Sequence, residues 1–254
     1  MTDEELLLKK RFCELARRSE TCGYYLFSDF LGLAEQSVFA EARASFGAAR
    51  YTAFGGHEGT ERVMIRFGSS EELGYEEPFP ITVLLIAPRS PKFADKLTHR
   101  DFLGALLNLG IERDTLGDIV IRDNCAYLFC KDDIADYIAS SLGRVRHTDV
   151  TCRPVPNEEL PEGELYATRE VRIQLSGERL DAAVAKVFSL SRDEAQQLIR
   201  RRLVFVCGRL TESTSYTPRV GDVISVRGHG RFIWQGAVGL SKKGKSNVSV
   251  LLYV

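Results

Sequence analysis

The hydrophobic pattern of the first 75 residues changes from a helical to a strand period. Apolar side chains at i, i+3 and i+4 spacing predict helices over residues 3–18 and 31–46. Short aromatic and β-branched runs then predict strands at 51–54 and 62–67, on either side of the glycine-rich turn at 55–59. These glycines favour a tight hairpin connection, and a phosphate-binding loop is the alternative.

Residues 76–153 alternate between strand and helix patterns. Thr98 and Asp101 stand at capping-box spacing before an amphipathic helix that Gly110 is expected to end as a C-cap. The remaining predicted elements are strands at 81–87, 118–122, 125–130 and 149–152 and a helix at 132–142. This order predicts a split βαβ plait of the kind found in RNA-recognition (RRM-like) modules.

One predicted strand of the plait carries two aromatic side chains on the same face. Tyr127 and Phe129 are separated by Leu128, so both point to one side of the strand. Exposed aromatics on a sheet can stack on RNA bases, which makes Tyr127 and Phe129 candidate stacking residues. Burial in a core is the competing interpretation.

The pattern breaks at residues 154–171, which hold three of the eight prolines and several glutamates. We expect a linker there. The predicted organisation is an α+β chain with an amino-terminal α/β domain (1–75), the RRM-like plait (76–153), the linker (154–171) and a small carboxy-terminal domain (172–254).

The carboxy-terminal domain begins with two short amphipathic helices. Ser191 and Glu194 form a capping box for the second helix, with Leu190 and Ala195 placed as its hydrophobic staple. The apolar stripe of the first helix is Leu180, Val184, Val187 and Phe188, which leaves Arg179, Ala183 and Lys186 on another face. Strands are predicted at 203–207, 222–227, 231–234 and 248–253.

Charge separates the two halves of the chain, although the formal net charge is only -1. Residues from Arg172 onward contain 14 basic and 6 acidic side chains, whereas the preceding part contains 20 basic and 29 acidic ones. A basic surface of this kind favours a polyanionic partner such as nucleic acid, and a surface that serves only solubility is the alternative. The acidic half is a candidate surface for a protein partner.

Cationic side chains gather on the second helix and in two glycine-containing turns. Arg192, Gln196 and Arg200 form an i, i+4, i+8 row on the helix. Glycine beside cations also lets the backbone donate to phosphate oxygens. The predicted RNA-binding residues are Arg179, Lys186, Ser191, Arg192, Gln196, Arg200, Arg201, Arg227, Arg231, Lys242, Lys243 and Lys245.

Several strings in this region are similar to known sequences. RLDAAVAKVFSLSRDEAQQLI, VFVCG and VGDVISV resemble the αL-type RNA-binding domain named after ribosomal protein S4. With the upstream strings FGGHEGTER, THRDFLGALLNLGIERDTLGDIVI and RGHGRF, the chain resembles the bacterial YlmH family. Two positions depart from the domain's usual pattern: Arg202 replaces a glycine, and Cys207 replaces the asparagine of V-N-G.

The resemblance implies a role in translation. It implies binding to ribosomal RNA and transfer RNA at the large ribosomal subunit, and a part in ribosome-associated quality control, where stalled and split subunits still hold peptidyl-tRNA. These implications come from the family and not from periodicity or charge.

An RNA-modifying enzyme, of the pseudouridine synthase or methyltransferase type, is the alternative function. The chain shows no G-x-G-x-x-G, G-x-S-x-G or H-E-x-x-H motif, and Arg179-Leu180-Asp181 falls inside a predicted helix. We therefore expect a non-enzymatic binder without a cofactor or metal. The six cysteines lack C-x-x-C spacing, and no membrane span or signal peptide is predicted, so we expect a cytoplasmic protein with reduced thiols.

Overall fold

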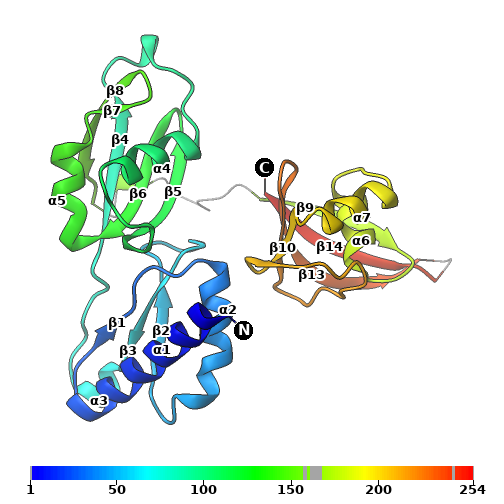
Figure 1. The fold of residues 1–254 in the computed structure, drawn as a ribbon, viewed down its shortest axis with the longest axis horizontal. Coiled ribbons are helices and arrows are strands. Elements are labelled where there is room, and N and C mark those ends of the chain that lie inside the picture. Colours follow the sequence, from blue (N-terminus) through cyan, green and yellow to red (C-terminus); the bar gives the residue numbers. More distant parts are fainter. Residues whose placement is uncertain (1, 157–158, 161–167, 242–243, 254) are drawn as a thin grey trace. The chain divides into compact units, whose positions relative to one another are not determined.

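The chain forms two compact units, Met1–Leu165 and Tyr166–Val254. A computed structural model describes residues 2–156, 159–160, 168–241 and 244–253 (Figure 1). The first unit joins the predicted regions 1–75 and 76–153, each of which keeps its own hydrophobic core. Helix and strand contents are similar, so the α+β class predicted from the sequence is confirmed.

The amino-terminal part of the first unit packs two helices on a small sheet. Its helices are α1 (Asp3–Cys22), α2 (Leu33–Ala42) and α3 (Ser70–Leu73), with the 3-10 turn η1 (Arg43–Ser45). Its sheet has the order β1-β3-β2, with β1 (Leu26–Phe27), β2 (Tyr51–Phe54) and β3 (Met64–Phe67). The predicted hairpin is therefore confirmed. Phe12 of α1 packs edge-on against Phe39 of α2, with ring centroids 5.2 Å apart, and both are buried.

The second part of this unit is the predicted plait. Its strands are β4 (Ile81–Pro88), β5 (Leu116–Arg122), β6 (Cys125–Lys131), β7 (Arg144–Val145) and β8 (Thr148–Pro154). Its helices are α4 (His99–Asn108) and α5 (Asp132–Ser141), with the 3-10 turns η2 (Pro91–Phe93) and η3 (Arg113–Thr115). The antiparallel sheet has the order β5-β6-β4-β8-β7, which is the strand order of a split βαβ plait with one short strand added.

The local signals in the plait act as predicted. The Thr98–Asp101 capping box is present, and the Thr98 backbone N–H donates to the Asp101 carboxylate at 2.8 Å. These hydrogen bonds lower the pKa of Asp101. The helix ends one residue earlier than predicted, because Leu109 is the C-cap and Gly110 follows it in the left-handed conformation at φ 79°.

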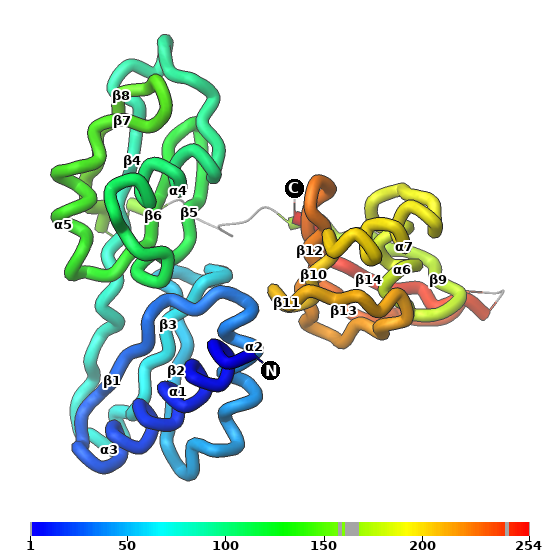
Figure 2. The backbone as a smooth tube through the Cα atoms, viewed as in Figure 1, coloured from blue at the N-terminus to red at the C-terminus, as the bar shows by residue number. Residues whose placement is uncertain are grey.

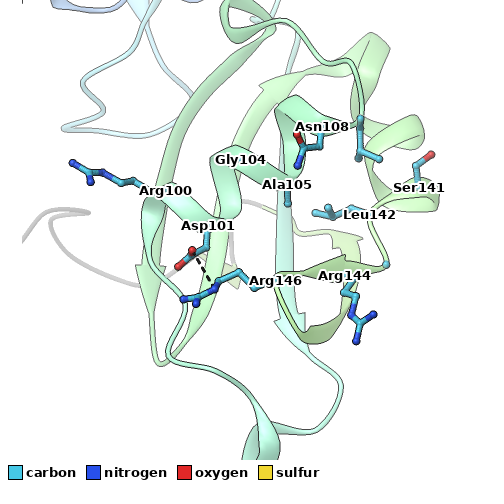
Figure 3. Close-up of a pocket in the computed structure, with 11 residues that line it drawn as sticks. Arg100, Asp101, Gly104, Ala105, Asn108, Ser141, Leu142, Arg144 and Arg146 are labelled. Atoms are coloured by element: carbon cyan, nitrogen blue, oxygen red, sulfur yellow. Dashed lines mark ion pairs between the residues drawn. The ribbon is translucent and has the colours of Figure 1, made fainter.

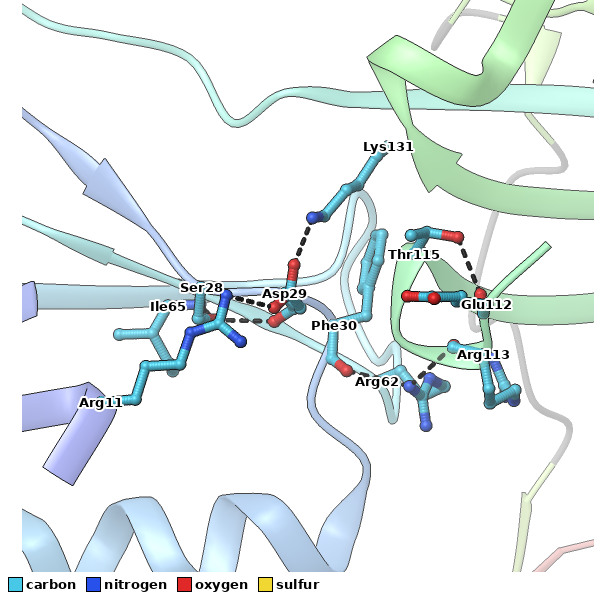
Figure 4. Close-up of polar contacts among 10 residues, drawn as sticks. All are labelled: Arg11, Ser28, Asp29, Phe30, Arg62, Ile65, Glu112, Arg113, Thr115 and Lys131. Atoms are coloured by element: carbon cyan, nitrogen blue, oxygen red, sulfur yellow. Dashed lines mark hydrogen bonds and ion pairs between the residues drawn. The ribbon is translucent and has the colours of Figure 1, made fainter. Parts of the chain in front are cut away.

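One arginine joins the two parts of the amino-terminal unit. The Arg62 guanidinium donates to the backbone carbonyls of Phe30 and Arg113 at 2.9 and 3.2 Å (Figure 4). It also donates to the Leu116 carbonyl at 2.9 Å. The Asp118 carboxylate accepts a further hydrogen bond from the Arg62 backbone N–H at 3.2 Å. Since these partners come from both parts, the hairpin is held firmly on the plait.

The same hairpin covers one face of the plait sheet. A Cβ atom on Gly56 would lie 2.6 Å from Cδ1 of Phe129, so only glycine allows this close approach. Gly56 also has φ 97°. The glycine-rich turn is therefore a packing element, and this use favours the hairpin over a phosphate-binding loop.

The carboxy-terminal unit is a six-stranded antiparallel sheet with two helices on one face (Figures 1 and 2). The sheet order is β11-β10-β12-β13-β14-β9. The strands are β9 (Thr168–Leu175), β10 (Val204–Val206), β11 (Arg209–Leu210), β12 (Val223–Val226), β13 (Gly230–Leu240) and β14 (Ser246–Tyr253). The helices are α6 (Leu180–Val187) and α7 (Arg192–Arg200).

Strand β9 begins inside the stretch that the sequence suggested as a linker. It pairs with β14 over its whole length, from Thr168 opposite Tyr253 to Leu175 opposite Ser246. Ile173 and Leu175 are buried in the core of this unit, around Trp234. The domain thus starts several residues before Arg172.

Candidate nucleic-acid interface

The second helix of the carboxy-terminal unit begins as the sequence predicts. The Ser191 hydroxyl accepts a hydrogen bond from the Glu194 backbone N–H at 3.2 Å, and the Glu194 carboxylate accepts from the Ser191 N–H at 2.7 Å. Ser191, a predicted RNA contact, is exposed, but its hydroxyl oxygen is engaged as the helix cap. The cap fixes the first residue of α7 and therefore which side chains share each face of the helix.

A buried carboxylate lies at the centre of the predicted basic surface. The Asp181 side chain on α6 is completely buried. Its oxygens accept hydrogen bonds from Arg179 Nε at 3.1 Å, from Arg192 Nε at 3.1 Å and from Gln196 Nε2 at 2.8 Å. We call these four residues the Asp181 cluster. A buried charge is costly unless it is paired, and here two guanidinium groups and an amide satisfy it.

Opposing effects act on the ionisation of this carboxylate. Burial alone would raise the pKa of Asp181, but the hydrogen bonds from Gln196, Arg192 and Arg179 lower it more, so the pKa lies below its ordinary value. Asp181 is therefore ionised at neutral pH. Its negative charge holds the two arginines in fixed positions.

The guanidinium groups of the cluster still face solvent. The Arg179 and Arg192 side chains are 42% and 57% exposed, although both contact a fully buried carboxylate. Lys186, Arg200 and Arg201 are exposed as well, and within the described part of the chain none of them has an ion-pair partner. The structure thus brings together Arg179, Arg192 and Gln196, with Arg200 and Arg201 further along the same helix and its C-cap.

One detail of the predicted surface is wrong. Ala183 was expected beside Arg179 and Lys186 on an open basic edge of α6, but it is fully buried in the core of the unit. The helix is buried on more than one side because α7 and the sheet both pack on it. The basic edge therefore belongs mainly to the start of α6 and to α7.

Cations also lie in the turn between β12 and β13 and at the start of β13. Arg227 lies over the ring of Phe205, 4.8 Å from its centroid, and Arg231 lies over Tyr253 at 4.1 Å. These contacts orient both side chains along the sheet. The His229 ring in the same turn is 5.8 Å from Phe188, the C-cap residue of α6.

Lys245, in the segment between β13 and β14, is separate from this region. That segment joins β13 to β14, whereas the Arg227 turn joins β12 to β13, so the two segments lie at opposite ends of β13. Eleven strand residues span about 35 Å. Lys245 is exposed, and the predicted contacts Lys242 and Lys243 lie outside the described residues. Of the described cations, Lys245 and Arg227 therefore lie towards opposite ends of β13.

The two predicted stacking residues on the plait, Tyr127 and Phe129, differ in burial. Phe129 is 0% exposed, because Gly56 and Gly117 pack directly on it, so it cannot stack on a base and that prediction is wrong. Tyr127 is half-buried on the same strand and stays a candidate. The pairing of Gly56 with Phe129 brings together residues far apart in the sequence, which the strand pattern could not reveal.

Asp181 is the candidate functional residue that sequence reasoning missed. It stands next to Leu180, at the start of a buried apolar stripe in a basic segment. Aspartate is almost never fully buried unless it is paired. Arg179, Arg192 and Gln196 stand close enough in the sequence to serve as its partners. An aspartate beside a buried stripe with such partners nearby could therefore have been predicted as a buried, paired carboxylate.

The described residues contain no group of three or more histidine, cysteine or acidic side chains placed to hold a metal ion. None of the helices in the described ranges has the length and apolar character required to span a bilayer. None of the six cysteines forms a disulfide.

Comparisons with known proteins match both halves of the chain. Residues 75–159 match the family model described as "Putative RNA-binding domain in YlmH", and residues 178–224 match the S4 domain. The "Ribosome-associated protein quality control protein P2" of Bacillus subtilis is 32% identical over 164 residues, which are 62% of this chain and 62% of that protein.

Two further similarities concern single regions or the fold. The "Small ribosomal subunit protein uS4" of Chromohalobacter salexigens is 42% identical over 62 residues, 24% of this chain and 30% of that protein. The solved structure of "Cell division protein ylmH from Streptococcus pneumoniae" matches with a TM-score of 0.50 and 20% identity. It covers 63% of this chain and 96% of that one, and it supports the fold alone.

Proposed function

Because the chain belongs to the YlmH family and ends in an S4 domain, we propose that it binds structured RNA on the ribosome through the Asp181 cluster and the adjoining arginines of α7. The observation that carries this proposal is the geometry of Arg179 and Arg192. Both are held by one buried carboxylate, yet 42% and 57% of their side chains remain exposed. Prepositioned guanidinium groups lose little freedom when they meet phosphate, which favours binding.

The proposed role is in ribosome-associated quality control, in the cytoplasm. This role comes from the name of the Bacillus subtilis relative, of which the matched stretch spans 62%. The finer proposal is that the RNA is ribosomal RNA or transfer RNA at the large subunit. The protein would act as a binder and not as an RNA-modifying enzyme, in keeping with the names of its relatives.

A salt titration of the full chain tests the RNA contact. Fluorescence anisotropy with labelled bulk transfer RNA and, separately, bulk ribosomal RNA should give a linear fall of log affinity with log salt. Four to six phosphate contacts predict a slope of roughly -3 to -5, from about -0.7 to -0.9 per contact. A slope near zero would argue against a phosphate interface.

The residues are tested by a matched pair of double variants. Arg192→Ala with Arg200→Ala should lower affinity about tenfold and reduce the slope by about 2. Arg169→Ala with Arg172→Ala removes two exposed arginines from β9 of the same unit and serves as the charge-matched control. Equal losses of RNA affinity in both variants would mean that the affinity depends on the net charge of the unit and not on the arginines of α7.

The enzymatic alternative has its own test. The full chain incubated with transfer RNA, with and without S-adenosylmethionine, should leave the nucleoside composition unchanged in mass spectrometry. New pseudouridine or methylated nucleosides would contradict the binder proposal.

A further inference from the structure

The amino-terminal unit is acidic overall but has one basic end. Up to Val171 the chain contains 20 basic and 29 acidic side chains. Residues 88–100 and 143–148, however, contain six basic side chains and a single acidic one, Asp95. We call the six basic residues the basic end: Arg89, Lys92, Lys96, Arg100, Arg144 and Arg146.

Hydrogen bonds bring these two segments together at one end of the plait. The Arg89 backbone N–H donates to the Asp149 carbonyl, and the Asp95 N–H donates to the Thr148 hydroxyl, both at 2.9 Å. Two carboxylates border the cations at longer range. Asp101 lies 3.7 Å from Arg146, and Asp149 lies 3.6 Å from Arg144, and both arginines remain more than half exposed. Such loose surface pairs leave the cations available to a ligand.

An aromatic side chain projects from the same end. Phe93 is 89% exposed, more than any other large hydrophobic residue in the described part of the chain. The loop that carries it is held in place. Phe93 closes a 3-10 turn by donating its N–H to the Ser90 carbonyl, and the Asn124 side chain bonds the backbone of Asp95 and Leu97 at 2.8 Å. An ordered backbone thus presents an unpacked ring to solvent beside Lys92 and Lys96.

A groove lies between α4 and the segment that leads into β7. It has a volume of about 730 Å³. Gly104 and Ala105 form part of its lining and leave room for a ligand, and Arg100, Arg144 and Arg146 stand around it. Figure 3 shows Arg146 turned towards Asp101, while Arg100 and Arg144 extend outwards on different sides.

We propose that the basic end is a second RNA-binding surface, in which Phe93 stacks on an unpaired base and the cations contact the neighbouring phosphates. Sequence-tolerant RNA sites combine a positively charged groove with exposed aromatic rings, and both features occur here together. The sheet face that RRM-like modules use is partly closed by Gly56 over Phe129. This cover limits RNA contact on that face, and the basic end supplies another surface. This inference rests on the proposed RNA-binding function.

The ring is tested with a single substitution in the full chain. Phe93→Ala should weaken binding of labelled bulk transfer or ribosomal RNA by about 5- to 20-fold, the lower part of the range for loss of one stacked base. Tyr137→Ala removes another exposed aromatic side chain of the same unit, 50% exposed on α5, and should leave affinity unchanged. Circular dichroism establishes that both variants are folded.

The cations are tested through the salt slope. Lys92→Ala with Lys96→Ala should reduce the slope by about 1 to 2. Lys10→Ala with Arg17→Ala removes two exposed cations from α1 and should change it less.

The outcomes separate the two proposals. The Phe93 and lysine variants could keep full RNA affinity while the Arg192/Arg200 variant loses it. That result would overturn RNA binding by the basic end and leave the proposed function standing. Wild-type protein that binds neither RNA would overturn the proposed function itself. Unchanged RNA affinity combined with weaker co-sedimentation with ribosomal subunits would assign the surface to a protein partner and also overturn this inference.

Discussion

Each unit contains a buried charged side chain, but the two charges are compensated in opposite ways. In the amino-terminal unit, Arg66 is 8% exposed and lies 4.8 Å from the Tyr25 ring centroid and 5.1 Å from that of Phe79. Glu76 pairs with it at 2.6 Å. In the carboxy-terminal unit, Asp181 is fully buried and its partners are the half-exposed guanidinium groups of Arg179 and Arg192.

The difference lies in which side of the pair reaches solvent. The cation of Arg66 is enclosed by aromatic rings, so its charge stabilises the fold and is not offered to a ligand. The buried anion of Asp181 instead anchors cations whose side chains stay about half exposed. Burying the anion and exposing the cations makes a surface suited to polyanions. The reverse arrangement makes a structural site.

The largest expected effect is the loss of Arg66. Arg66→Ala removes two cation–π contacts, an ion pair and the buried part of the side chain, and should lower the free energy of unfolding by about 3 kcal/mol. Circular dichroism should show the loss in the amino-terminal unit, whereas fluorescence of Trp234, the chain's one tryptophan, buried in the other unit, should keep its transition. Arg50→Ala, which removes an exposed pair to Glu72, is the control. A matching shift of the Trp234 transition would mean that Arg66 does not act on the amino-terminal unit alone.

The next effect in size is that of neutralising Asp181. Asp181→Asn keeps the size of the side chain but loses charge-assisted hydrogen bonds. The free energy of unfolding of the carboxy-terminal unit, followed by Trp234 fluorescence, should therefore fall by about 2 kcal/mol. RNA affinity should fall about fivefold, because Arg179 and Arg192 lose their common anchor. Removal of a negative charge alone would instead raise RNA affinity.

Asp193→Asn separates these explanations. It neutralises an exposed aspartate on the neighbouring helix α7, so it should raise RNA affinity slightly or leave it unchanged. Higher affinity in both variants would mean that Asp181 acts on RNA only through its charge and does not position the arginines.

A smaller effect is expected from pH. The pKa of Asp181 is lower in the folded protein than in the unfolded chain, so its contribution to stability is complete above the unfolded value of about 3.9 and is lost as the pH falls through the folded value. The stability difference between wild type and Asp181→Asn should therefore be constant from neutral pH to about pH 5 and shrink below pH 4. Urea unfolding followed by Trp234 fluorescence measures it. A difference that stays constant into strong acid would contradict an ionised Asp181.

Sequence reasoning succeeded where the structure depends on neighbours in the chain. The capping boxes at Thr98 and Ser191 are encoded within four residues, and both are present. It failed where the outcome depends on distant segments. Phe129 is buried by Gly56, and Ala183 is buried by a neighbouring helix and sheet. Strand β9 was hidden because its alternating Val171, Ile173 and Leu175 follow an acidic, proline-containing stretch.

The smallest expected effect tests the position at which the chain departs from the usual S4 pattern. Arg202 has φ 61°, a left-handed conformation that costs little only for glycine. Arg202→Gly should therefore raise the free energy of unfolding of the carboxy-terminal unit by about 0.5–1 kcal/mol. The lost pair with Glu212, at 3.2 Å between two largely exposed side chains, offsets little of this gain. In thermal unfolding followed by Trp234 fluorescence, the midpoint should rise by about 2–6 °C. Arg202→Ala removes the same pair but keeps a Cβ, so it should show no such rise. A rise of equal size in both variants would trace the effect to the arginine side chain and not to the backbone.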